Sequence, residues 1–300
     1  MFRVSFGMRT TLLLAPVLLQ AALANTSDIP FTLQQSAEVR EQPGFVPIGQ
    51  GKIWYAERGA GPAVVLIHGG NLDSRMWDRQ VKALAGPFRV IRYDVRPYGR
   101  SSAPTAAYHA VDDLRALLDH LKLERAHLVG LSLGGRIAID FSLRYPARVA
   151  RVVVSGPGVT GFQWSPDEAF KPMAEAARQG NPDKAVELWL RHPYMTPAMS
   201  NPALAGEIRQ IAHGNEHIWT LTDYEQFDSP PAMQRLAEIK VPLLVLVGER
   251  DVPDIHAIVK RLEDRVSGAR VVRIPRAGHM LNMEAPDEFN HLVREFLSRP

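Results

Sequence analysis

Short runs of apolar, mostly β-branched residues alternate along the chain with longer segments in which apolar residues recur at helical spacing. The helical spacing is seen over residues 111–121, 134–144, 255–266 and 286–297. Several of the short runs are continuously apolar, which is typical of strands buried on both faces. The alternation predicts an α/β fold with a mostly parallel central sheet flanked by helices. The predicted strands cover residues 53–57, 63–67, 89–93, 126–130, 151–155, 243–247 and 270–274.

The alternation of strand and helix patterns stops between residues 156 and 236. No strand pattern stands out there, and short helical segments rich in Pro, Trp, Met and Ala follow one another. Three of the five tryptophans, Trp164, Trp189 and Trp219, lie here. Side chains of this size favour a packed subdomain over a loop. We therefore expect residues 157–235 to form a helical cap, inserted into an α/β core made of residues 25–156 and 236–300.

Residues 1–24 have a pattern of their own. Arg3 and Arg9 precede an apolar stretch that runs through residues 12–19, and the segment ends in the small residues Ala22 and Ala24. This layout predicts a signal peptide cleaved after Ala24, and hence a periplasmic or secreted protein without a stable membrane anchor after cleavage. The apolar stretch is shorter than the roughly 20 residues of a spanning helix. An uncleaved anchor or an exposed N-terminal helix is the alternative.

Composition and charge narrow the class of ligand. Of 300 residues, 46% are hydrophobic, enough for one large core, and the net charge is +3. Without Arg3 and Arg9 the charge is 33 minus 32, or +1. No basic run stands out, which argues against nucleic acid as a partner and favours a small molecule. The absence of cysteine excludes disulfides, thiolate metal sites and a cysteine nucleophile. No feature specifies an oligomeric state.

A Gly-x-Ser-x-Gly motif follows the predicted strand 126–130 and opens the predicted helix 134–144. Its members are Gly130, Ser132 and Gly134. A serine on a sharp strand-to-helix turn exposes its hydroxyl above the sheet, and the tight turn requires small residues two positions to either side. The motif predicts Ser132 as a catalytic nucleophile. The helix N-terminus places the amide of Leu133 where it can stabilise negative charge on a substrate oxygen.

A serine nucleophile needs a base, and the base needs an acid to orient it. Asp251 lies in the loop after the predicted strand 243–247, with Glu249 and Asp254 as rival acids. His279 follows Gly278 in the loop after the predicted strand 270–274. The order Ser, Asp, His is the order of this type of triad. We predict Asp251 as the acid and His279 as the base; the alternative for His279 is a histidine of a surface loop.

The loop after the predicted strand 63–67 begins His68-Gly69-Gly70-Asn71. Its glycines allow the backbone to approach a bound substrate closely. We expect the amide of Gly70 to be the second oxyanion donor beside Leu133, with the amide of Asn71 as the alternative. His68 is expected to brace the loop.

Together these motifs resemble the capped α/β-hydrolase superfamily over residues 46–298. The matching pieces are residues 66–70, 94–101, 130–135, 248–251 and 278–279. The resemblance implies nucleophile Ser132, acid Asp251, base His279 and oxyanion amides at Gly70 and Leu133, with no cofactor. The 94–101 loop departs from the usual pattern, with Pro97 where a glycine is common. The branches that look similar are carboxylesterases, enol-lactonases, carbon-carbon bond hydrolases acting on dienoic acids, and cofactor-free haloperoxidases.

The cap offers substrate contacts and one apparent metal motif. We select Trp164, Trp189, Met195 and Trp219, with Asn71 of the core, as candidate contacts, although most large side chains of the cap are expected to form its own core. The other large side chains considered are Phe162, Tyr194, Met199 and Phe227. Residues 213–217 match His-x-x-Glu-His, a zinc signature, but Gly214 and Asn215 disfavour the helix that the motif requires, so no metal is expected.

The sequence thus predicts an exported serine hydrolase that cleaves carboxylic esters or lactones through an acyl-enzyme on Ser132. Carbon-carbon bond hydrolysis or perhydrolysis by the same triad is the first alternative. A ligand-binding protein that kept the fold without turnover is the second, since fold alone does not establish function.

Overall fold

The computed structural model of the chain describes residues 40–49 and 51–299. The predicted signal peptide, residues 1–24, lies outside the described residues. The described strands form one sheet in the order β1-β2-β4-β3-β5-β6-β7-β8. They are β1 (Gln42–Ile48), β2 (Gly51–Arg58), β3 (Ala63–Ile67), β4 (Arg89–Tyr93), β5 (Ala126–Leu131), β6 (Val149–Ser155), β7 (Leu243–Gly248) and β8 (Arg270–Ile274).

The sheet is parallel from β4 to β8 and antiparallel at the β1–β2 edge. β3 pairs with both β4 and β5, with Ile67 opposite Tyr93 on one side and Gly130 on the other. β2 runs antiparallel to β4, and β1 antiparallel to β2. Every residue of β3, β5 and β7 is buried, as expected for central strands covered on both faces. The carboxyl ends of six parallel strands therefore meet at one edge of the sheet.

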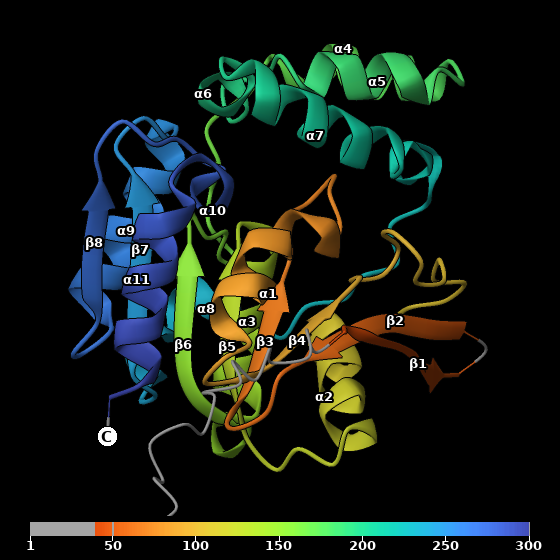
Figure 1. Cartoon of the computed structure of the whole chain (residues 1–300). Helices are drawn as coiled ribbons and strands as arrows, with labels where there is room; N and C mark the ends of the chain where they lie inside the picture. The colour runs from red at the N-terminus through yellow and green to blue at the C-terminus, as the bar shows by residue number, and fades with distance from the viewer. Residues whose placement is uncertain (1–39, 50, 300) are drawn as a thin grey trace, which may run out of the picture. The chain divides into compact units, whose positions relative to one another are not determined.

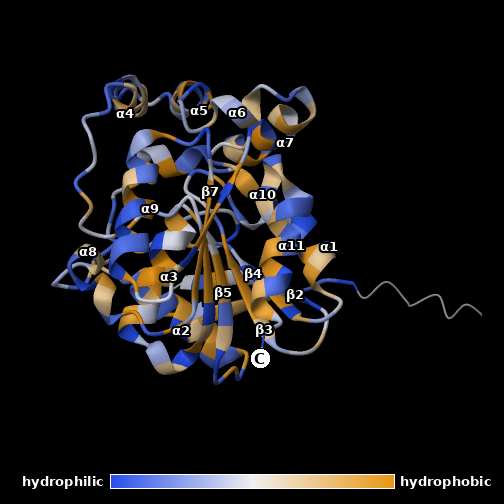
Figure 2. Cartoon of the chain, turned by 90° about the vertical axis from the view of Figure 1, so that its left-hand side faces the viewer, coloured by the Kyte–Doolittle hydropathy of each residue, from blue (hydrophilic) through white to orange (hydrophobic). Residues whose placement is uncertain are grey.

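Helices cover both faces of the sheet (Figure 2). On one face α2 (Ala110–His120), α3 (Leu133–Arg144) and α9 (Pro253–Arg265) bury their apolar sides. On the other face lie α1 (Asp78–Leu84) and α11 (Pro286–Leu297), which contact each other. Single 3-10 turns at Ser74–Trp77, Pro146–Arg148 and Leu236–Glu238, and the short α10 (Leu281–Glu284), complete the connections.

Between β6 and β7 the chain leaves the sheet and forms a layer of helices above the carboxyl ends of the strands (Figure 1). These are α4 (Phe170–Arg178), α5 (Pro182–Trp189), α6 (Thr196–Met199) and α7 (Pro202–His213), followed by a 3-10 turn at Glu216–Thr220. α8 (Ala232–Arg235), at the end of the insertion, packs against α3 of the core. Among the described residues, no helix has both the length and the apolar content to span a bilayer.

Candidate active site

Ser132 lies on a strained turn between β5 and α3. Its backbone has φ 53° and ψ −109°, a positive φ that non-glycine residues rarely adopt. A Cβ on Gly130 would lie 2.2 Å from the carbonyl oxygen of Gly134, and one on Gly134 would lie 2.0 Å from that of Ile67. Both positions therefore require glycine. The turn places Ser132 at the floor of a cavity between the sheet and the cap.

Asp251 and His279 lie in the loops that follow β7 and β8, and their side chains meet. His279 Nδ1 lies 2.9 Å from Asp251 Oδ2 and 3.1 Å from Oδ1, and the carboxylate side chain is fully buried. The amide of Val252 donates to Asp251 Oδ1 at 2.8 Å, which fixes the carboxylate. Because Nδ1 faces the acid, Nε2 is the ring nitrogen left to take a proton, and His279 lines the same cavity as Ser132.

The two rival acids lie elsewhere. Asp254 is in the first turn of α9 and accepts hydrogen bonds from the amide and hydroxyl of Ser165, at 2.8 and 2.7 Å. Glu249 is exposed, and its amide donates to the carbonyl of Ile274. Among the described carboxylates, Asp251 is the one hydrogen-bonded to His279.

The loop after β3 brings two candidate oxyanion donors to the cavity, Gly70 and Asn71. Burial raises the pKa of Tyr98 to about 12, and the backbone amide of Asn71 partly opposes this rise. In the described part of the chain the amides of Gly70 and Leu133 have no hydrogen-bond acceptor. Gly70 stays the expected partner of Leu133, with Asn71 as the alternative.

His68 braces the loop after β3, as expected. Its Nδ1 lies 2.8 Å from the carbonyl oxygen of Gly69, and its Nε2 accepts a hydrogen bond from the amide of Val95 at 2.8 Å. The ring is completely buried, and burial lowers its pKa. A neutral His68 thus connects the loops that follow β3 and β4.

The 94–101 loop is organised around the buried carboxylate of Asp94. That carboxylate accepts hydrogen bonds from the amides of Ser74 and Arg100, at 3.1 and 2.9 Å. Gly99, at φ 59°, leaves no room for a Cβ beside Asp94. The Arg96–Pro97 peptide is cis. The loop therefore contributes structure next to the site, and His68 stacks edge-on against its Tyr98 at 5.2 Å.

The cavity over Ser132 and His279 has a volume of about 410 Å³, a size suited to a small-molecule substrate. Four of the five candidate contacts line it: Asn71, Trp164, Trp189 and Met195. The fifth, Trp219, does not line it. It lies beside a separate hollow with Phe170, Ala174 and Leu221, because the 3-10 turn that carries it packs against α4 and α5.

The cavity wall also contains Phe170, Asp167 and Asp254, which the sequence pattern did not single out as contacts. Tyr194, one of the large cap side chains considered from the sequence, lines it as well, with its ring centroid 4.7 Å from that of His279. No repeat or motif marks these positions, because they come together only when the cap folds back over the sheet. The one sequence feature that could have indicated them is the cap loop directly before α4, which mixes polar and aromatic residues.

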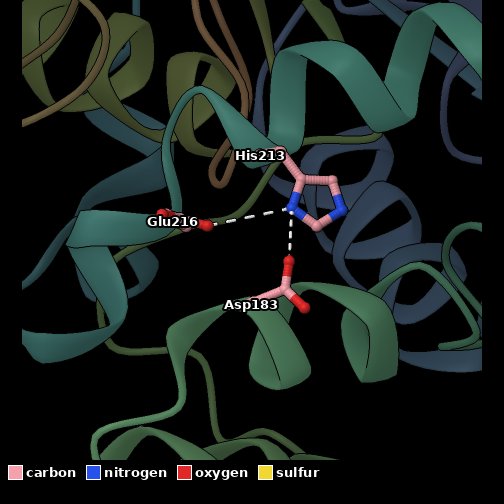
Figure 3. Close-up of side chains that lie close together, drawn as sticks. All are labelled: Asp183, His213 and Glu216. Atoms are coloured by element: carbon pink, nitrogen blue, oxygen red, sulfur yellow. Dashed lines mark ion pairs between the residues drawn. The ribbon is translucent and has the colours of Figure 1, made fainter.

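The His-x-x-Glu-His motif does not bring its two histidines together. His213 ends α7, whereas the Nε2 of His217 lies 3.0 Å from the carbonyl oxygen of Pro97. His213 Nδ1 instead lies 3.1 Å from Asp183 and 3.8 Å from Glu216, as Figure 3 shows. Its Nε2 lies 2.9 Å from Glu187. Carboxylates lie at both ring nitrogens of His213, and Asp183 is largely exposed. These are features of an ion-pair cluster on the protein surface.

Asn215, in the middle of that motif, joins cap and core. Its side-chain amide donates to Asp73 at 2.9 Å, and its carbonyl oxygen accepts from the amide of Gly99 at 2.7 Å. The side chain is almost completely buried. The motif therefore attaches the end of α7 to two core loops.

The geometry of elbow, acid, base and cap has a counterpart among known proteins. The model of the alpha/beta hydrolase family matches residues 64–292, more than two thirds of the chain. The chain belongs to the α/β hydrolase family. As a member of this family it is an enzyme, and it shares the family's hydrolase chemistry.

Relatives of this α/β hydrolase have several activities. A carboxylesterase of Bacillus subtilis (strain 168) is 29% identical, over 79% of this chain and 80% of its own length. A 2-hydroxy-6-oxo-6-phenylhexa-2,4-dienoate hydrolase of Comamonas testosteroni is 32% identical, over 82% and 91%. The crystal structure of the enol-lactonase from Burkholderia xenovorans LB400 superposes with a TM-score of 0.73 and 29% identity, covering 85% of this chain and all of that one.

Proposed function

We propose that this hydrolase cleaves carboxylic esters or lactones through an acyl-enzyme on Ser132. The observation that carries the proposal is the convergence of Ser132 and the His279–Asp251 pair on one cavity of about 410 Å³. An enol-lactonase and a carboxylesterase among the similar proteins agree with this substrate class.

The site supports a two-step reaction. Ser132 Oγ attacks the acyl carbon while His279 Nε2 takes its proton, and Asp251 stabilises the imidazolium that forms. The amides of Gly70 and Leu133 donate to the oxyanion of the tetrahedral intermediate. His279 then protonates the leaving alcohol. Water, deprotonated by the same histidine, releases the acid and restores Ser132.

Turnover of uncharged p-nitrophenyl esters and aryl lactones by wild type and S132A tests this proposal. We expect S132A to lower kcat by at least about 10³-fold, because the nucleophile is lost while the cavity is kept. A 2-hydroxy-6-oxo-dienoate in the same assay covers the alternative reaction of the carbon-carbon bond hydrolases. Turnover of the dienoate with no turnover of any ester or lactone would contradict the proposal.

We also propose, on the sequence of residues 1–24, that the protein is exported and that its mature chain begins at Asn25. The mass of the protein recovered from periplasm or medium tests this, and an intact Met1 on such material would contradict it. Supporting this proposal are the two arginines, the apolar stretch and the small residues before Asn25.

A further inference from the structure

The cavity wall above Ser132 combines aromatic rings with negative charge. Trp164, Trp189 and Tyr194 supply aromatic surface, and Asp167 and Asp254 supply two carboxylates. None of the described residues that line the cavity is a lysine or an arginine. A wall of this kind is unfavourable for a substrate carboxylate and favourable for a cation.

The carboxylate of Asp167 has two hydrogen-bond donors, and neither of them is a lysine or an arginine. Its Oδ2 lies 2.7 Å from His192 Nε2, and its Oδ1 accepts from the amide of Ala169 at 2.9 Å. His192 Nδ1 in turn accepts a hydrogen bond from the amide of Tyr194 at 3.2 Å, so the ring proton lies on Nε2 and the ring is a neutral donor. The carboxylate side chain is 39% exposed and is not neutralised by its partner.

Asp254 also lacks a cationic partner. It binds the amide and hydroxyl of Ser165, both neutral donors. Across residues 40–49 and 51–299, neither Asp254 nor Asp167 forms an ion pair with lysine or arginine. The field of both carboxylates reaches Tyr194: burial raises the pKa of this phenol most, and the charges of Asp251, Asp254 and Asp167 raise it further.

The aromatic part of the wall includes one exposed indole and one ring that packs on the histidine bound to Asp167. Trp164 is 48% exposed and is held edge-on against Phe162, with ring centroids 5.2 Å apart. Phe170 packs on His192, the donor to Asp167, at 4.7 Å. Indole faces attract alkylammonium groups most strongly among aromatic rings. Ser165 follows Trp164 in the chain and binds Asp254, so the Trp164 ring and the Asp254 carboxylate lie on one stretch of the wall.

We propose that this cavity selects esters that carry an alkylammonium group, which binds between the carboxylates of Asp167 and Asp254 and the indole rings of Trp164 and Trp189. This selection rests on the proposed ester hydrolysis at Ser132. It makes Asp167 and Asp254 specificity-determining residues and disfavours substrates with a carboxylate at the same position.

Two pairs of esters of equal shape test the proposal. One pair places the charge on the alcohol: butyrylcholine against 3,3-dimethylbutyl butyrate. The other places it on the acyl group: the p-nitrophenyl esters of 4-(trimethylammonio)butanoic and 5,5-dimethylhexanoic acid. In at least one pair we expect kcat/KM of wild type to be about tenfold higher for the cationic ester. Equal values, or a preference for the neutral ester, in both pairs would overturn the proposal.

Variants assign the preference to the two carboxylates. D167N and D254N keep the shape and one acceptor oxygen at each position, so we expect each to reduce the cationic-to-neutral ratio, and the double variant to bring it close to one. Glu168, next to Asp167 and paired with Lys171 on the surface, gives the matched control E168Q, which should keep the wild-type ratio. A ratio that survives in the double variant, or that falls equally in E168Q, would overturn the assignment.

The neutral esters separate this proposal from the proposed function. Their hydrolysis by wild type, lost in S132A, would support the ester reaction whatever the charge preference. Equal turnover of both members of each pair would therefore overturn the selection of cations alone. If the double variant does not fold, the two single variants carry the same comparison, since each removes one charge.

Discussion

At the scale of single residues, two carboxylates hold His279 from two directions. Asp251 binds the ring. Glu284 binds the backbone on both sides: its Oε2 accepts from the amide of Gly278 at 2.8 Å and its Oε1 from the amide of Met280 at 2.9 Å. Burial raises the pKa of Glu284, and the two amide donors oppose that rise. We assign Glu284 as a positioning residue that acts through the conformation of the His279 loop.

Replacement of Glu284 by glutamine leaves one amide facing an NH₂ group, which cannot accept its hydrogen bond. We expect E284Q to lower kcat by about tenfold, because a small displacement of the base weakens proton transfer, while KM stays near the wild-type value. Steady-state kinetics on a neutral p-nitrophenyl ester measures both parameters.

Glu288 provides the control for this substitution. It is exposed in the first turn of α11, so E288Q makes the same chemical change away from the loop. Wild-type kcat in E284Q, or a loss of equal size in E288Q, would contradict the positioning role of Glu284.

At the scale of elements, the strands of the parallel sheet follow directly from the sequence, because their apolar runs are continuous. The predicted 63–67, 89–93 and 270–274 strands have the observed bounds, and the others differ by one or two residues at one end or, for 53–57, at both. β1 was not predicted, since Pro43, Gly44 and Pro47 interrupt its pattern; an edge strand tolerates them because one side of its backbone needs no ladder hydrogen bonds. α1, of seven residues, is too short for a clear helical period.

One contact between elements should depend on pH. Asp140 of α3 accepts a hydrogen bond from Thr160, in the segment after β6, at 2.6 Å, and lies 3.6 Å from Arg136. Burial raises the pKa of Asp140 to about 6, and Thr160 and Arg136 only partly oppose this. A carboxyl whose pKa is higher in the folded state than in the unfolded state stabilises the fold at low pH. That contribution is lost as pH rises through about 6.

We therefore expect the stability of wild type relative to D140N to fall by up to about 3 kcal/mol between pH 4 and pH 7, the equivalent of a two-unit pKa difference. Urea unfolding of both proteins across this range gives the difference at each pH. A difference that stays constant, or that grows with pH, would show that Asp140 is not held in its neutral form by the fold.

At the scale of the whole molecule, the sheet brings together four loops that are distant in sequence, after β3, β5, β7 and β8. Three of these strand ends carry the residues that motifs alone predicted: Ser132, Asp251 and His279. Ser132 and His279 line one cavity, and Asp251 binds His279 from behind the cavity wall. These residues could be predicted from the sequence because a parallel sheet aligns the carboxyl ends of its strands. The cavity wall was harder to predict, because the docking of the cap decides which of its side chains face Ser132. Trp219 illustrates this: it shares the composition of the wall but lies outside it.

The central claim is that Ser132 is the nucleophile of this molecule. Reaction of the folded protein with a fluorophosphonate, followed by peptide mapping by mass spectrometry, tests it most directly, because phosphonylation needs an activated serine with its base and oxyanion donors in place. We predict one adduct, on Ser132, and none in S132A. A folded sample that stays unlabelled, or that is labelled at another serine, would contradict the claim.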